Sequence, residues 1–68
     1  MNKINEAINE IQVEIDSLNK RNDAFFREIE LDEENAEYYE NQIADNDAII
    51  LELEEQIHNL RLKLKEMK

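Results

Sequence analysis

The chain has 68 residues and a mass of 8.2 kDa, so it holds at most one small domain. It contains no Gly, Pro or Cys, which excludes hairpin-rich β folds, glycine loops for phosphate, disulfides and thiolate metal sites. Its 18 acidic and 8 basic residues give a net charge of −10, which disfavours direct binding to nucleic acid or to anionic membranes.

One apolar pattern runs along the whole chain. With Met1 at heptad position a, 17 of the 20 a and d positions are apolar, and the other 48 positions hold 11 apolar residues. A repeat of 3.5 residues kept over nearly ten heptads is typical of a left-handed coiled coil. We therefore expect an all-α fold, a long heptad-repeat helix that self-associates, with residues 1–68 as one element without separate domains.

The pattern is strongest at the two ends of the chain. Residues 4–18 place Ile-Ile-Ile-Ile-Leu at successive core positions, and residues 50–67 place Ile-Leu-Ile-Leu-Leu-Met there. Between them, Asn22, Asp32 and Asn46 occupy core positions, within segments rich in Asn and Asp at residues 19–23, 32–35 and 45–47. These side chains compete with helical hydrogen bonds and cap new helices, and Asn also adopts the left-handed conformation that ends a helix.

Two main architectures follow from this pattern. The heptad phase continues without a shift through residues 32–35, which favours one mostly continuous helix paired with other copies. An antiparallel helical hairpin turning near Asn35 is the alternative, and a three-helix arrangement is a third. Each of them requires the apolar seam to be covered, because a single helix cannot bury it.

Antiparallel pairing fits the sequence better than parallel pairing. Layers that join an a position to a d position, with residue numbers summing to 68, place Asn22 opposite Asn46, where the two amides satisfy each other. A buried amide without a partner costs on the order of 1–3 kcal/mol, which selects this register. We predict a homo-oligomer, a dimer or higher, whose interface consists of Ile4, Ile8, Ile11, Ile15, Leu18, Asn22, Phe25, Ile29, Tyr39, Ile43, Asn46, Ile50, Leu53, Ile57, Leu60 and Leu64.

The middle of the chain is the candidate surface for a larger partner. Residues 28–55 hold twelve acidic residues and no basic one, and several apolar side chains there lie off the seam. A solvated acidic face and flank packing are the simplest interpretations, and exposed aromatics also act as anchors in interfaces. The predicted partner-binding residues are Phe26, Glu30, Leu31, Glu34, Glu37 and Tyr38.

The composition points away from catalysis. His58 falls at a surface position without a second His or any Cys, and Ser17 is the only hydroxyl side chain of the Ser or Thr type. We expect no enzyme activity, cofactor or metal, and a cytoplasmic location by default. The leading hypothesis is an assembly or adaptor protein acting through protein–protein contacts. The alternative is a small acidic inhibitor that mimics nucleic acid or blocks a protein partner; the nine Asn and nine Ile are typical of low-GC bacteria and their phages.

Overall fold

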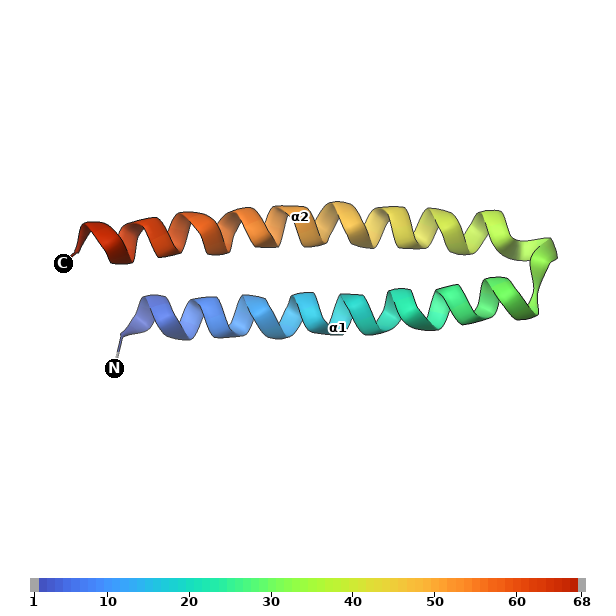
Figure 1. Cartoon of the computed structure of the whole chain (residues 1–68), viewed down its shortest axis with the longest axis horizontal. Coiled ribbons are helices and arrows are strands. Elements are labelled where there is room, and N and C mark those ends of the chain that lie inside the picture. Colours follow the sequence, from blue (N-terminus) through green and yellow to red (C-terminus); the bar gives the residue numbers. More distant parts are fainter. Residues whose placement is uncertain (1, 68) are drawn as a thin grey trace.

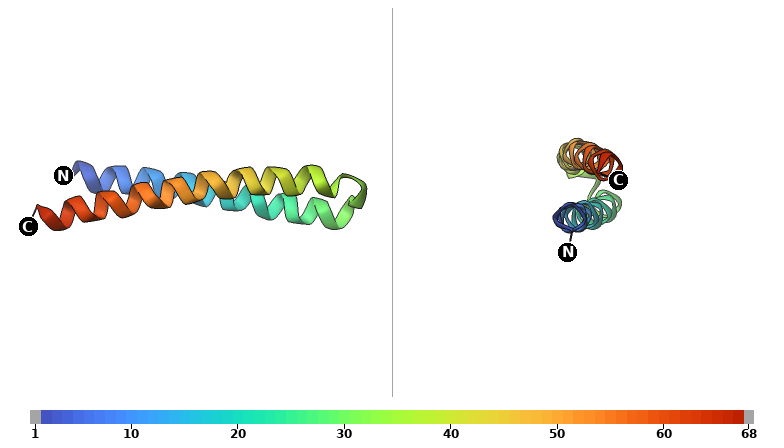
Figure 2. Two further views of the ribbon diagram at one scale, coloured as in Figure 1. Left: turned by 90° about the horizontal axis from the view of Figure 1, so that it is seen from above. Right: turned by 90° about the vertical axis from the view of Figure 1, so that its left-hand side faces the viewer.

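The computed structural model, which describes residues 2–67, is an antiparallel helical hairpin (Figure 1). Helix α1 (Lys3–Leu31) leads through a 3₁₀ turn (Glu33–Asn35) into helix α2 (Ala36–Glu66). The result is a slim rod of 54 × 18 × 11 Å with both chain ends at one tip and the turn at the other. The two helices cross at a shallow angle when seen from above (Figure 2). The all-α, antiparallel prediction is confirmed, in its hairpin form.

The continuous helix favoured by the heptad phase is not formed, because the chain reverses at residues 32–35. Asp32 leaves the helical region, with φ −139° and ψ 80°, while its amide still donates to the Glu28 carbonyl at 2.8 Å. The Asn35 side-chain amide then donates to the Asp32 carboxylate at 2.7 Å. These short polar side chains therefore fix the turn through local hydrogen bonds.

The turn does not use the left-handed conformation that Asn can adopt at the end of a helix. Asn35 has φ −104° and ψ 14°, and no residue that the structure describes has a positive φ. The reversal is thus made by one non-helical residue, Asp32, followed by one 3₁₀ turn, which explains how the chain reverses without Gly.

The other segments rich in Asn and Asp remain helical. Helix α1 runs through residues 19–23 and α2 runs through residues 45–47. At the start of α1, the Asn2 side chain accepts a hydrogen bond from the Ile4 amide at 2.9 Å, as an N-cap does. Tertiary packing along the seam overrides the local preference of Asn and Asp at residues 19–23 and 45–47.

The core follows the predicted heptad positions. Between Ile4 and Leu64, every a and d side chain is buried or half-buried, and only Ala7 and Gln42 reach this level at other positions. A cluster of Ile15, Ile50, Leu53 and Ile57 forms its centre, and Ile8, Ile11 and Leu18 pack against it. Two helices cannot enclose this core, and among residues 2–67 no large side chain is fully buried.

Candidate protein interaction surfaces

A polar layer lies near the middle of the seam. Asn22 is only 5% exposed, and its Oδ1 accepts a hydrogen bond from Asn46 Nδ2 at 2.9 Å. The predicted Asn22–Asn46 contact therefore forms, within one chain. Asn22 Nδ2 also donates to Asp47 Oδ1 at 3.0 Å, a partner that the sequence did not reveal. These hydrogen bonds join three side chains in one layer. Among the described residues, every buried side-chain N or O atom has a hydrogen-bond partner.

The turn end of the rod is strongly acidic. Residues 28–40 contain seven acidic residues and no basic one, so the tip holds most of the net charge of −10. Burial raises the pKa of the Tyr39 hydroxyl, and the carboxylates of Glu28 and Asp32 raise this pKa further. The Tyr39 ring packs on Phe25, with centroids 5.9 Å apart, and meets Tyr38 edge-on at 5.4 Å. An anionic tip is thus built around an aromatic cluster.

The hairpin has two long flanks, one on each side of the seam. We call the flank of positions c, g and d the Ile49 flank, and the flank of positions b, e and a the Phe26 flank. In antiparallel packing these position sets lie on opposite sides of the helix pair. Two shallow hollows lie on these opposite sides. One is lined by Glu14, Ser17, Leu18, Arg21 and Ile49, and the other by Gln12, Glu54, Ile57, His58 and Arg61.

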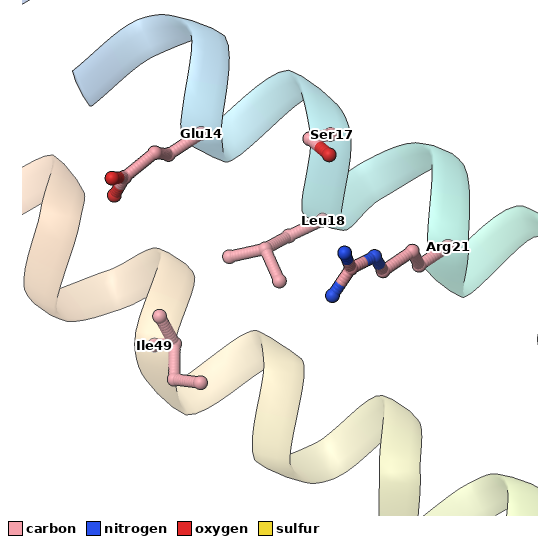
Figure 3. Close-up of a pocket in the computed structure, with 5 residues that line it drawn as sticks. All are labelled: Glu14, Ser17, Leu18, Arg21 and Ile49. Carbon is pink, nitrogen blue, oxygen red and sulfur yellow. The ribbon is translucent and has the colours of Figure 1, made fainter. Parts of the chain in front are cut away.

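The hollow on the Ile49 flank is the larger, at about 260 Å³ against about 170 Å³. Figure 3 shows Leu18 extending from α1 towards α2, where Ile49 lines the same hollow. Glu14 and Arg21 extend from α1 on either side of Ser17, which lies between them in the chain. The hollow is therefore apolar in the centre, with one acidic and one basic group at its edges.

The structure divides the predicted partner-binding residues between the two flanks. Leu31 and Tyr38 are 82% and 58% exposed, and their c positions belong to the Ile49 flank. Phe26 is 54% exposed at an e position, on the opposite flank. The carboxylates divide in the same way, with Glu30 and Glu37 on the Phe26 flank and Glu34 on the outer face of the turn; all three are exposed. The six residues therefore do not form one continuous patch.

The sixteen predicted interface residues face one another inside a single chain. All of them are buried or half-buried, so the hairpin already covers the inner side of the seam. Their role between copies stays a prediction. Sequence reasoning gave little weight to the exposed apolar side chains elsewhere on the rod, namely Val13, Ile49, Leu51, Leu62 and Met67. Val13, Ile49, Leu51 and Leu62 lie off the seam, and that was the available signal. Met67 is different, because its d position was expected in the core; it is 71% exposed, since it lies just beyond the end of α2 at Glu66.

Other kinds of site find little support. Within residues 2–67, no group of three or more His, Asp or Glu side chains is placed to hold a metal ion, and His58 is exposed. Neither helix, over its described length, is both long and apolar enough to cross a membrane. Comparison with protein-family models, with curated proteins and with solved structures finds no match to this chain.

Proposed function

We propose that this protein is a non-enzymatic assembly or adaptor module that acts through protein–protein contacts. The observation that carries the proposal is the incomplete core. The seam is closed within one chain, yet most of its side chains stay half-buried and eight large apolar side chains are more than 40% exposed. A two-helix rod of this size needs a further partner to stabilise it, since chains this short bury little surface alone.

Association makes a direct prediction for the purified chain. We expect the thermal midpoint to rise with protein concentration over a hundredfold range, and sedimentation to show a mass above 8.2 kDa at the upper end. A midpoint independent of concentration, with a monomeric mass throughout, would refute self-assembly.

The adaptor role assigns the Phe26 flank near the turn to a larger partner. Phe26 offers an exposed aromatic anchor, and Glu30 and Glu37 lie on the same flank as acidic neighbours. The partner's surface is then expected to be basic with an apolar recess. Changing Glu30, Glu34 and Glu37 together to Lys should abolish partner capture and leave the helical circular dichroism unchanged.

The matched control changes three exposed acids away from the turn end, Glu6, Asp16 and Glu55, to Lys. It alters the net charge equally and should leave capture intact. If both triple variants lose capture to the same degree, general charge attraction explains the binding and the adaptor surface is wrong.

The acidic-inhibitor function is the second candidate, and the concentration of carboxylates at one tip favours it. Seven acidic residues at residues 28–40, on two helices and their turn, resemble the charge density of a short phosphate array. Its test is competition with duplex DNA for a basic DNA-binding protein in a defined buffer. Displacement by the native chain, and not by the Glu30, Glu34 and Glu37 variant, would favour the inhibitor over the adaptor.

A further inference from the structure

We propose that a second copy of this chain packs against the Ile49 flank, with its rod antiparallel to the first and the two-fold axis passing beside Ser17. This inference rests on the proposed self-assembly and names its geometry. The product is a four-helix bundle in which α1 lies against α1 of the other copy and α2 against α2 of the other copy.

The Ile49 flank is the less enclosed side of the core. The d side chains of the seam lie towards this flank, and the a side chains lie towards the Phe26 flank. Among the buried residues, Ile15, Asn22, Ile43, Ile50 and Ile57 are all at a positions, and Leu53 alone is at d. The remaining d side chains from Ile4 to Leu60 are half-buried. Covering this flank therefore completes the burial of the existing core.

The centre of the Ile49 flank is self-complementary about a two-fold axis. Ser17 is the middle residue of helix α1 (Lys3–Leu31), and the hollow lies at this point of the rod. An axis beside Ser17 places Glu14 of each copy opposite Arg21 of the other, giving two attractive pairs at the edges of the hollow. The small Ser17 side chain permits close approach of the two α1 helices at the axis.

The charge of the two ends decides between antiparallel and parallel rods. Parallel rods would bring together two tips that each hold seven acidic residues and no basic one at residues 28–40. Antiparallel rods place each tip beside the open end of the other copy, where Lys3 and Lys63 belong to the same flank. Like charges in contact destabilise an interface and opposite charges steer it, so the antiparallel arrangement is favoured.

The exposed area is sufficient for such an interface. The chain exposes 5616 Å², whereas a compact protein of 8.2 kDa exposes about 4,500 Å². The excess of about 1,100 Å² per chain exceeds the roughly 800 Å² that each partner contributes to a stable interface of standard size. Glu52 is the unfavourable element, because its c position on α2 brings it close to Glu52 of the other copy.

The first experiment measures the dimer dissociation constant of charge variants by sedimentation. Arg21→Glu should weaken the dimer about tenfold, because it turns both Glu14 pairs from attractive to repulsive. Adding Glu14→Arg to that variant should restore the affinity. The control, Lys20→Glu, makes the same charge change one residue away on the outer face of α1 and should have little effect. Glu52→Gln should strengthen the dimer.

Equal effects of Arg21→Glu and Lys20→Glu, or no rescue by the double variant, would overturn the proposal. A control on folding is built in, since the rescued variant contains both substitutions and must be helical to dimerise.

The second experiment uses single cysteines, which the chain otherwise lacks. Ser17→Cys at the axis should form a disulfide-linked dimer within an oxidising glutathione buffer, because linkage requires Cβ atoms about 3.5–4.5 Å apart. Asn35→Cys in the turn should remain unlinked, and Asn19→Cys on the opposite flank should remain unlinked as well.

The outcomes separate this inference from the proposed function. Linkage of Asn35→Cys in place of Ser17→Cys would establish parallel rods, and linkage of Asn19→Cys would establish the Phe26 flank as the interface. Either result overturns the proposed geometry while self-assembly stands. A chain that stays monomeric in sedimentation overturns both.

Discussion

The polar layer in the seam offers the sharpest test of the packing. Replacing Asn46 by Leu removes the donor to Asn22 Oδ1 and leaves that oxygen in a side chain that is 5% exposed. An unsatisfied buried acceptor costs about 1–3 kcal/mol, and the half-buried Leu recovers about 1 kcal/mol. We expect a net loss of about 1 kcal/mol in the free energy of unfolding.

The same substitution at the other position of the pair should destabilise the chain less. Asn22→Leu leaves Asn46 half-buried and Asp47 exposed, where water replaces the lost partner, and it places a Leu at a buried position. The burial of the Leu side chain and the loss of the Asn22 hydrogen bonds each change the free energy of unfolding by about 1–2 kcal/mol in opposite directions. This variant should therefore be close to neutral in stability. The double variant has no orphaned amide and should be about 1 kcal/mol more stable than the native chain.

The free energy of unfolding of the native chain, the two single variants and the double variant is measured by urea unfolding followed by circular dichroism, at one protein concentration. The dependence of this free energy on urea concentration should be the same for all four chains. The expected coupling between the two positions is about 2 kcal/mol. If the two single changes add to the double change within about 0.3 kcal/mol, the hydrogen-bonded layer does not stabilise the register and the reasoning is wrong.

Two further predictions concern the turn and the pH. Asn35→Gly should lower the free energy of unfolding by about 1 kcal/mol, because it deletes the 2.7 Å hydrogen bond to Asp32 and no positive φ rewards Gly there; a more stable variant in urea unfolding would contradict this turn. The pKa of Tyr39 is raised in the folded chain, so its contribution to stability is intact below pH about 10 and is lost as the pH rises through the folded value. Tyr39→Phe should flatten this alkaline decline in thermal midpoint, and an unchanged slope would show that Tyr39 is not its cause.

The heptad positions predicted the seam and its antiparallel register, but they did not decide between one helix and two. Antiparallel packing joins a to d, and a turn centred on Glu34 joins them without a change of heptad phase. Phase continuity is therefore equally compatible with a hairpin. The hairpin forms because the hydrogen bond between Asn35 and Asp32 stabilises the chain reversal. Asn22 and Asn46 remain helical because their side chains are hydrogen-bonded to each other in the seam.

The candidate interaction surfaces could be predicted only in part from the sequence, for a different reason. The heptad letters of Phe26 and Tyr38 already placed them on opposite sides of the seam, so their separation follows from the sequence once the hairpin is known. The contact of Asp47 with Asn22 and the smaller burial of the d side chains depend on how the two helices approach each other. Helix spacing and orientation are set by packing of the whole seam, which no local pattern encodes.

The pairing of residues around a turn at Glu34 has a consequence for how the chain folds. Each layer farther from the turn joins residues more distant in the chain, so loop-closure entropy favours layers that form in order from the turn towards the open end. The hydrogen-bonded layer joins residues 24 and 25 positions apart, between the turn-side layers and the main apolar cluster. A chain that begins to close in a shifted register must leave the Asn22 amide unpaired before the Ile15–Leu53 region can pack. We therefore expect the layer to disfavour misaligned hairpins early in closure, while few contacts have formed.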